Sequence, residues 1–381
     1  MKIFYIYTAL LTKGGADRVI TEKANWLSEH GFEVGIITDS QMGRPPIFPL
    51  SPKVKLINLD IDFAKEYGHN FFVRTFLYYK LMREYKDALK EVLKKNKPDI
   101  VITTMGRDLD FLTDIYPDGV IIGEAHTTKY FLRNFHLLEQ KGFPFKQIAW
   151  YWRRKMDRKA RKLNGIVLLT KEDAESWKDT NKTFVIPNSL PFEPTNSSVL
   201  ENKQAIAVGR YNNAKGYEYL VEAWKTVHQK HPDWKINIYG SGEQKELVKA
   251  MIKNYNLQDS MLMHEPTDDI MDCYLKSSIC IVSSRYEGFS MVILESMICG
   301  VPVVSFDCPH GPRNIIKSGE DGILVEYLNA QAMADNICKL IESPKLRKAM
   351  GEKARSNIRR FSRENVMQQW TKLFNELTHH Q

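Results

Sequence analysis

Two glutamates in the second half of the chain, Glu287 and Glu295, have the residue type and spacing for a role in chemistry. They lie in the segment SSRYEGFSMVILESMICGVP, residues 283–302. A helix between them would separate the two carboxylates by ~12 Å along its axis, at about 1.5 Å per residue. Carboxylates that act as a couple on one glycosidic bond lie roughly 5 Å apart in retaining hydrolases. We therefore expect two separate contacts along one extended ligand, with a helix that starts near Gly288 and Ser290.

Glu295 is flanked on both sides by apolar residues. A buried carboxylate needs hydrogen-bond partners or water, because an unpaired buried charge is costly. The vicinal hydroxyls of a ribose would supply such partners, and so would a nearby Arg or Lys. The backbone N–H groups of Gly288, Phe289 and Ser290 come just before the expected helix, where a phosphate would be bound favourably.

Two cations follow a strand-like run in VGRYNNAKG, residues 208–216. Arg210 comes at the end of that run and Lys215 stands just before a predicted helix. Cations at the end of a parallel strand suit a phosphate or diphosphate. Ordinary solvated loop charges are the alternative interpretation.

Two glycine-containing turns follow predicted strands, LTKGGADRV at 11–19 and YGSGEQ at 239–244. Neither matches GxGxxG or a Walker A loop, so neither indicates a dinucleotide or an ATP γ-phosphate site. Gly14, Gly15 and Gly240 could still offer backbone N–H groups to an anion or a sugar oxygen. The alternative is a tight turn without a ligand.

His126 follows Glu124 at the end of another predicted strand, in EAHTTK at 124–129. A single histidine is more often structural than catalytic, but the carboxyl end of a parallel strand favours a functional role. Two Asp-x-Asp tripeptides, at 60–62 and 108–110, lack further ligands nearby in sequence. We therefore expect no metal site.

Short apolar runs of strand length alternate with amphipathic stretches of helix length. Their apolar residues are continuous, which favours strands buried on both faces and hence parallel sheets. Ligands of such sheets bind beyond the carboxyl ends of the strands. The predicted strands are KIFYIYTAL at the N-terminus and residues 33–38, 99–104, 119–126, 165–170, 183–187, 204–210, 235–240, 260–265, 278–284, 302–307 and 322–325.

The pattern predicts two doubly wound α/β domains that face each other across a cleft, the default ligand site. The first spans residues 1–190 and the second spans 204–361. A linker rich in Pro, Asn and Ser, residues 191–203, separates them. The last predicted helix, 362–378, has Ser362 as its N-cap and an apolar stripe, and we expect it to pack back on the first domain.

The 381-residue chain has a net charge of +8, which favours anionic partners. Residues 146–162, KQIAWYWRRKMDRKARK, contain eight basic residues, one acid and three consecutive aromatics. This segment fits a helix lying on an anionic membrane and fits an ordinary amphipathic helix equally. No recognition motif accompanies the charge, so we expect no nucleic-acid partner.

The five cysteines are odd in number and none is spaced as CxxC, which suits a reducing cytoplasm. The apolar N-terminus lacks a small-x-small cleavage site and is expected to be a buried first strand rather than a signal peptide. No run approaches the ~18 apolar residues of a membrane span.

Taken together, these motifs resemble the GT-B glycosyltransferases of family four. The segment SSRYEGFSMVILESMICGVPVV is similar to that family's signature of two glutamates separated by seven residues. The supporting matches occur in the family's order along nearly the whole chain: KGGADRV near the N-terminus, VIPNSL at 185–190, VGR…KG at 208–216, YGSG at 239–242 and GPRNII…GILV at 311–325.

The resemblance implies a GT-B fold of two Rossmann-like domains, with the acceptor on the first and the donor mainly on the second. Arg210 and Lys215 would hold the donor diphosphate, and Glu295 the ribose hydroxyls. Glu287 would contact the donor sugar together with the backbone at 288–290. The same resemblance implies that Gly14 and Gly15 approach the donor phosphate or sugar and that His126 lines the reaction centre.

The implied function is retaining transfer of a sugar from a nucleotide-diphosphate sugar to a glycan or lipid-linked glycan. It needs no metal or other cofactor and would occur in the cytoplasm or on the inner face of the cytoplasmic membrane. The segment MHEPTDD, residues 263–269, lacks the glycine frequent near the nucleobase in the family, so the base is open, with uridine favoured over guanosine. The alternatives are a nucleotide-sugar epimerase and a non-catalytic nucleotide-sugar-binding subunit of a glycan-assembly complex.

Overall fold

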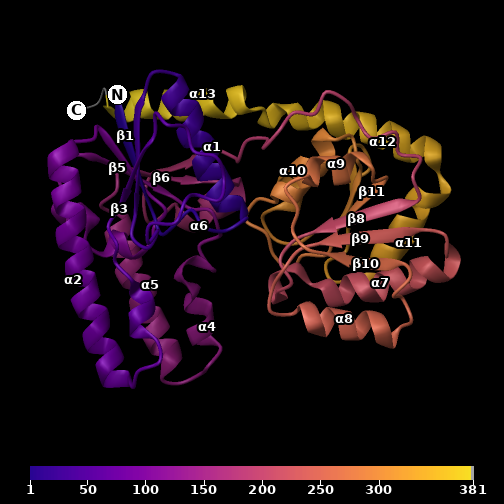
Figure 1. Cartoon of the computed structure of the whole chain (residues 1–381), viewed down its shortest axis with the longest axis horizontal. Coiled ribbons are helices and arrows are strands. Elements are labelled where there is room, and N and C mark those ends of the chain that lie inside the picture. The colour runs from indigo at the N-terminus through magenta and orange to yellow at the C-terminus, as the bar shows by residue number, and fades with distance from the viewer. Residues whose placement is uncertain (379–381) are drawn as a thin grey trace. The chain divides into compact units, whose positions relative to one another are not determined.

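The chain forms two compact units, each built around one parallel sheet (Figure 1). The computed structural model describes residues 1–378. The first unit comprises Met1–Pro187 together with the C-terminal helix from Met367 onward, and the second comprises Asn188–Val366. Residues 191–203, which the sequence predicts to be a linker, fall within the second unit.

The first unit contains seven parallel strands in the order β3-β2-β1-β4-β5-β6-β7. Their apolar side chains are buried on both faces, as the continuous runs predict; Ile3 and Phe4 of β1 are fully buried. The strands are β1 (Lys2–Tyr7), β2 (Glu33–Thr38), β3 (Lys55–Asn58), β4 (Ile100–Thr103), β5 (Val120–Glu124), β6 (Gly165–Leu168) and β7 (Thr183–Val185).

β3 is the one strand of the first sheet that the sequence analysis misses. It lies at the edge of the sheet and pairs on one side with β2, with Ile36 opposite Leu56. Lys55 is exposed and the other three residues of β3 are half-buried, so β3 has no continuous apolar run. An edge strand needs less apolar surface than a central one, and this is why its pattern is weak.

The helices of the first unit mostly connect successive strands, and polar side chains cap several of them. Asn70 Oδ1 accepts a hydrogen bond from Val73 N–H at the start of α2, at 3.1 Å. The elements are α1 (Gly15–Glu29), η1 (Phe63–Glu66), α2 (Phe71–Asn96), η2 (Arg107–Asp110), α3 (Leu112–Ile115), η3 (Leu132–Asn134), α4 (Phe135–Glu139), α5 (Phe145–Ala160), α6 (Lys171–Trp177) and α13 (Arg363–Thr378).

The second unit contains six parallel strands in the order β10-β9-β8-β11-β12-β13, and all six match predicted runs. The strands are β8 (Gln204–Val208), β9 (Lys235–Tyr239), β10 (Met261–His264), β11 (Ile279–Val282), β12 (Val303–Phe306) and β13 (Gly322–Val325). The helical elements are η4 (Asn213–Lys215), α7 (Tyr217–Lys230), α8 (Lys245–Asn254), α9 (Ile270–Leu275), α10 (Met291–Ile298), η5 (Pro312–Asn314), α11 (Ala330–Glu342), α12 (Pro344–Asn357) and η6 (Ile358–Phe361).

The C-terminal helix α13 contributes its apolar stripe to the first unit. Ser362 Oγ accepts a hydrogen bond from Asn365 N–H at 3.4 Å, so Ser362 caps this helix. The Trp370 ring lies under the Lys23 ammonium of α1, 4.3 Å from the ring centroid. The Phe374 ring meets Phe32 edge to face at 6.4 Å. No helix within the described residues is long and apolar enough to cross a membrane.

We expect Trp370→Ala to destabilise the protein by roughly 3–5 kcal/mol, the usual cost of emptying a buried aromatic site. Trp370 is 2% exposed and its ring contacts the buried Lys23. Urea-induced unfolding measures the effect. Gln368→Ala, an exposed change on the same helix, is the control and should alter stability by less than about 0.5 kcal/mol. Equal effects of the two substitutions would show that α13 is not packed through Trp370.

Candidate active site

The predicted donor residues follow β8 and β11, which are neighbours at the centre of the second sheet. From β8 the chain adds β9 and β10 toward one edge of the sheet, and from β11 it adds β12 and β13 toward the other edge. The pair β8 and β11 is therefore the topological switch point of this sheet. Ligands of such sheets bind beyond the carboxyl ends of the strands, at a switch point. In the second unit, the loops that follow this pair are residues 209–216 and 283–290.

These two loops are held together by hydrogen bonds to backbone carbonyls. Arg285 N–H donates to the Ala214 carbonyl at 2.8 Å, and Ser283 Oγ–H donates to the Lys215 carbonyl at 2.9 Å. Gly216 has a φ of +57°, and a Cβ built on it would lie 2.4 Å from the Ser283 carbonyl oxygen. Only glycine tolerates both that backbone conformation and that approach, so the close meeting of the loops depends on Gly216.

Lys215 and Glu287 form an ion pair between the two loops, with Nζ 2.6 Å from Oε1. The Ser284 hydroxyl donates to the same oxygen at 2.7 Å. The Lys215 and Glu287 side chains are 22% and 12% exposed, so the pair is sheltered yet reachable from solvent. The sequence analysis treats these two residues as separate contacts, and the structure joins them into one charged site. The sequence gives no signal for Ser284, because a serine three residues before a glutamate is common.

A third loop, after β12, closes on Glu287 from another side. His310 forms an isolated parallel bridge with Glu287. A Cβ built on Gly311 would lie 2.5 Å from the Glu287 Cβ, so a larger residue there would displace the carboxylate. Burial, with the nearby Glu287 charge, raises the pKa of the Cys308 thiol to about 12, so this thiol stays protonated.

Glu295 lies in α10, which begins at Met291 after Ser290, as predicted from the glycine and serine. Its side chain is nearly buried, at 7% exposed. Glu295 Oε2 accepts a hydrogen bond at 3.0 Å from the hydroxyl of Tyr274, a fully buried residue of α9. Burial, followed by the charge of Glu295, raises the pKa of Tyr274, which keeps the phenol protonated as a donor. The sequence analysis names a ribose, an Arg or a Lys as partners and misses this tyrosine.

The residues before α10 keep a polar atom without a partner. Ser290 is 1% exposed, and its Oγ has no hydrogen-bond partner within residues 1–378 and does not cap the helix. Phe289 is anchored against Phe361 at 5.4 Å between ring centroids. A buried hydroxyl at a helix start, two residues after Gly288, can donate to a ligand oxygen. The substrate-binding roles predicted for residues 288–290 remain predictions.

Of the other two residues predicted in the donor site, Arg210 has an exposed side chain and Gly240 lies where two loops cross. Arg210 is exposed in the loop after β8. A Cβ built on Gly240 would lie 1.9 Å from the Gly209 carbonyl oxygen, so this glycine permits the backbone of two loops to cross. The Gly240 N–H already donates to the His264 carbonyl at 3.1 Å. A structural reason therefore accounts for Gly240, and its predicted contact with substrate remains a prediction.

Gly14 is the N-cap residue of α1 and Gly15 is its first residue, at the end of the loop that follows β1. This position is again a switch point, between β1 and β4. The Asp17 carboxylate, 3% exposed, accepts hydrogen bonds from the Tyr7 hydroxyl and the Thr12 N–H, both at 2.7 Å. A carboxylate already occupies the first turn of α1, so this turn suits a neutral sugar oxygen better than a second anion.

Glu124 ends β5, His126 follows two residues later, and both lie against Lys23 of α1 in one cluster. Glu124 is 1% exposed and accepts a hydrogen bond from the Lys23 ammonium through Oε1. The His126 Nε2 lies 3.3 Å from that oxygen without forming a hydrogen bond, and Glu124 Oε2 has no partner within the described part of the chain. No sequence pattern identifies Lys23, which is about one hundred residues distant in the chain.

The charges in this cluster set the protonation of His126. Burial lowers the pKa of the imidazole, and the opposing attraction of Glu124 does not restore it. Burial alone would raise the pKa of Glu124, but Lys23 and His126 outweigh it and hold that pKa below its usual range. At neutral pH the cluster therefore contains an ionised Glu124 and a neutral His126, which can donate a hydrogen bond through one ring nitrogen and accept one through the other.

The two Asp-x-Asp tripeptides are engaged in the fold. Asp62 Oδ1 caps η1 by accepting from Ala64 N–H at 3.0 Å. Asp110 accepts from Arg133 at 2.7 Å and from Lys155 at 2.9 Å. Asp108 is 2% exposed, and burial raises its pKa to about 6. These contacts give the tripeptides a structural role, and metal independence itself remains a prediction.

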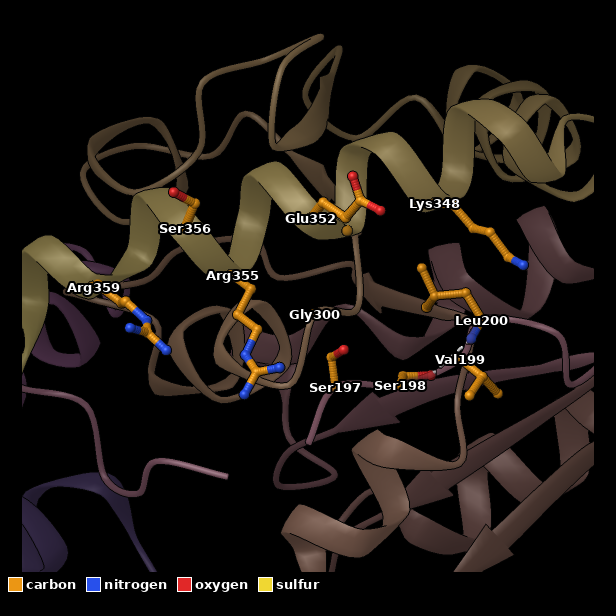
Figure 2. Close-up of a pocket in the computed structure, with 11 residues that line it drawn as sticks. Ser197, Ser198, Val199, Leu200, Gly300, Lys348, Glu352, Arg355, Ser356 and Arg359 are labelled. Atoms are coloured by element: carbon orange, nitrogen blue, oxygen red, sulfur yellow. Dashed lines mark hydrogen bonds between the residues drawn. The ribbon is translucent and has the colours of Figure 1, made fainter. Parts of the chain in front are cut away.

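A separate hollow of about 580 Å³ lies along α12 in the second unit (Figure 2). Arg355 reaches across it and donates to the Pro194 carbonyl at 2.8 Å, while Lys348 pairs with Glu201 at 2.9 Å. A Cβ on Gly351 would lie 2.3 Å from the Gly300 carbonyl oxygen. These contacts attach the segment after residue 193 to α12 around the hollow. No predicted site residue lines the hollow.

Comparison with known proteins identifies the family of the chain. Residues 13–193 match the family model described as Glycosyltransferase Family 4, and residues 192–357 match that described as Glycosyl transferases group 1. An uncharacterised glycosyltransferase of Haemophilus influenzae is 28% identical over 97% of this chain and 98% of its own. The amylovoran biosynthesis glycosyltransferase AmsD of Erwinia amylovora is 26% identical over 98% and 99%.

Solved structures show the same fold. S. aureus TarM, solved in complex with fondaparinux, alpha-GlcNAc-glycerol and UDP, has a TM-score of 0.79 at 18% identity and covers 98% of this chain and 99% of its own. The chain therefore belongs to the GT-B glycosyltransferases of the family-four type. Its two parallel-sheet α/β units confirm the predicted fold class.

We expect Lys23→Met to destabilise the protein by about 3–5 kcal/mol near pH 7, because it leaves the buried Glu124 charge unpaired. In the native chain the lowered pKa of Glu124 contributes stability above about pH 4.3, the unfolded value. In the variant, burial raises that pKa, so protonation relieves the penalty as the pH falls. The deficit relative to the native chain, measured by urea unfolding, should shrink between about pH 7 and pH 5.

Lys182→Met is the matched control for this prediction. Lys182 pairs with Glu376 at 2.8 Å, but the side chains are 58% and 37% exposed. Removing an exposed pair of this kind should cost less than about 1 kcal/mol. A Lys23→Met deficit that is the same at both pH values would contradict the ionised state assigned to Glu124.

Proposed function

We propose that the protein transfers a sugar from a UDP-sugar to a glycan or lipid-linked glycan, with retention of anomeric configuration and without a metal. The observation that carries the proposal is the sheltered Lys215–Glu287 pair at the switch point of the second sheet. Membership of the glycosyltransferase family gives the reaction class. The UDP in the TarM structure supports the donor, and the alpha-GlcNAc-glycerol in that structure and the role of AmsD in amylovoran biosynthesis support the acceptor.

In the proposed donor complex, Lys215 and Arg210 bind the diphosphate. Bond cleavage leaves negative charge on that diphosphate, and preorganised cations and N–H groups lower the barrier by stabilising it. Lys215 would be shared between Glu287 and the phosphate, so Glu287 holds the ammonium in position before the donor arrives. Glu287 itself would then accept hydrogen bonds from sugar hydroxyls, next to the N–H groups of residues 288–290.

Glu295 is proposed to bind the ribose. The Tyr274 hydrogen bond fixes one carboxylate oxygen and orients the carboxylate. Vicinal hydroxyls would donate to it, since an ionised carboxylate accepts several hydrogen bonds. Glu287 lies before α10 and Glu295 in its second turn, so the two carboxylates would contact different parts of one nucleotide sugar.

In the first unit, neutral His126 is proposed to hydrogen-bond the donor sugar at the reacting carbon, with Gly14 and Gly15 approaching a sugar oxygen. The carbon–oxygen bond to the leaving phosphate breaks as a bond to the acceptor oxygen forms on the same face. The acceptor's proton moves to the phosphate oxygen that has just left. This route needs no covalent glycosyl-enzyme, because the phosphate serves as the base.

Localisation in the cytoplasm is part of the proposal. All five cysteines are unpaired and four are buried, as suits a reducing compartment.

A panel of nucleotide sugars, screened by thermal shift and then by product formation in EDTA, tests the proposal. We expect one UDP-sugar to stabilise the protein and to be consumed only with an acceptor, and NMR to show the donor's anomeric configuration in the product. Conversion of the donor to its epimer without an acceptor would favour the epimerase instead. Binding without transfer or hydrolysis would favour the non-catalytic subunit. Loss of all activity in EDTA would overturn metal independence.

Two substitutions separate the proposed roles of the glutamates. We expect Glu295→Ala to weaken UDP binding at least about tenfold, since it removes charge-assisted hydrogen bonds to the ribose. Glu287→Ala should lower kcat by roughly a hundredfold while UDP affinity changes little, because Lys215 remains free to bind the diphosphate. Calorimetric UDP titration and steady-state kinetics measure the two effects.

Glu222→Ala, at an exposed position of α7, is the matched control and should leave both quantities unchanged. Equal loss of UDP affinity in Glu287→Ala and Glu295→Ala would contradict the division of roles.

A further inference from the structure

Exposed aromatic side chains gather in two stretches of the first unit, residues 67–79 and 130–151. Their exposed fractions run from 40% to 83%. Elsewhere within residues 1–378, Tyr255 and Tyr327 are the only aromatic residues comparably exposed. Clusters of this kind are rare on soluble surfaces and mark binding sites. The members are Tyr67, Phe72, Phe76, Tyr79, Tyr130, Phe143, Phe145, Trp150 and Tyr151.

On α2 the aromatics form a stripe. Phe72, Phe76 and Tyr79 follow a spacing of four and then three residues, which places them on one face of the helix. Phe72 is 82% exposed and Phe76 is 69% exposed. Lys80 and Arg83 continue the same side of the helix toward its C-terminus. This face therefore changes from aromatic to basic along its length.

α5 repeats that arrangement. Trp150 and Tyr151 are about half exposed, and exposed Arg154 and Arg158 follow them. The Arg154 guanidinium lies 4.2 Å from the centre of the Trp150 ring, so the aromatic and basic parts are in contact. The opposite face of the helix is buried and attaches α5 to the core: Ala149, Met156 and Ala160.

The two helices point the same way. Each precedes a parallel strand of one sheet, β4 or β6, so each runs back from the carboxyl ends of the strands. Figure 1 shows that the N-terminal halves of α2 and α5 extend beyond the strands, and that the connection from α4 to α5 also does so. The two helices are also linked through Asp110, which accepts a hydrogen bond from Lys155 of α5. Burial raises the pKa of Tyr78 on α2, and the negative charge of Asp110 raises it further.

Basic residues outnumber acidic ones in both stretches. Residues 67–83 contain three Lys or Arg and no Asp or Glu, and residues 130–158 contain seven Lys or Arg and two acids. Both acids are paired, Glu139 with Arg153 and Asp157 with Lys129. Aromatic rings with cations beside them suit the interface of an anionic bilayer, where rings enter the headgroup layer and cations meet lipid phosphates. A symmetric contact between two copies would instead bring like charges together.

We propose that this aromatic–basic surface, residues 67–83 and 130–158, docks on an anionic lipid membrane. Docking would bring the carboxyl ends of the first sheet, where Gly14 and His126 lie, toward the lipid headgroups. A lipid-linked acceptor would then reach the first unit without leaving the bilayer. The docking itself does not depend on the proposed transfer reaction and is testable without a donor or an acceptor.

Flotation of the full chain with vesicles tests the docking. We expect binding to vesicles of phosphatidylglycerol and phosphatidylethanolamine, little binding to phosphatidylcholine vesicles, and release by high salt. Phe76→Ser with Trp150→Ser should abolish most of the flotation. Arg154→Gln with Arg158→Gln should weaken it about fivefold for each charge removed. These four positions are exposed, so folding should be preserved, as thermal unfolding will check.

The matched controls lie on α8 and just after it in the second unit: Leu247→Ser with Tyr255→Ser, and Lys249→Gln with Lys253→Gln. These side chains are also exposed, and both control variants should float like the native chain. Equal loss in controls and test variants would overturn the surface assignment. Absence of flotation would also overturn it. A dimer seen in sedimentation, and dissociated only by Phe76→Ser with Trp150→Ser, would overturn it in favour of a contact between two copies. UDP binding should survive in every variant, which separates this result from failure of the proposed function.

Discussion

The close contact between Gly216 and the Ser283 carbonyl oxygen is the constraint on which the site of the second unit depends. Any side chain at residue 216 would force apart the loops that follow β8 and β11. With glycine there, Arg285 N–H reaches the Ala214 carbonyl and the Lys215 ammonium reaches Glu287. A backbone position without a side chain thus places a cation and an anion, far apart in sequence, at the switch point of the sheet.

The two units use buried charge in different ways. Lys215 and Glu287 are partly exposed, so an incoming anion can share the ammonium without a large desolvation cost. Lys23 and Glu124 are 4% and 1% exposed, and a pair so buried is not exchanged for a ligand. Its effect is on its neighbours: Glu124 stands beside His126, and Lys23 lies against the Trp370 ring of α13. The C-terminal helix is thereby coupled to the charged cluster at the end of β5.

Much of the fold could be predicted because strands of parallel sheets are buried on both faces and so appear as continuous apolar runs. That signal found all six strands of the second sheet and six of the seven in the first, and it failed for β3, whose half-exposed residues carry no such run. Glycine and serine likewise marked the start of α10 correctly. The partners of the site residues could not be predicted in this way, because Ser284, Tyr274 and Lys23 have no distinctive local pattern.

The sequence by itself determined the glycosyltransferase family, the two parallel-sheet units and the residues, Lys215, Glu287 and Glu295, around which a donor site is proposed. These follow from residue type, order and periodicity, which are local properties of the chain. Only the tertiary structure decided that Lys215 pairs with Glu287 and that Tyr274 orients Glu295. It also decided that the N-terminal halves of α2 and α5, which carry exposed aromatic residues, share one end of the first unit. Such contacts arise from strand order and close backbone approach, which bring together residues that the sequence keeps far apart.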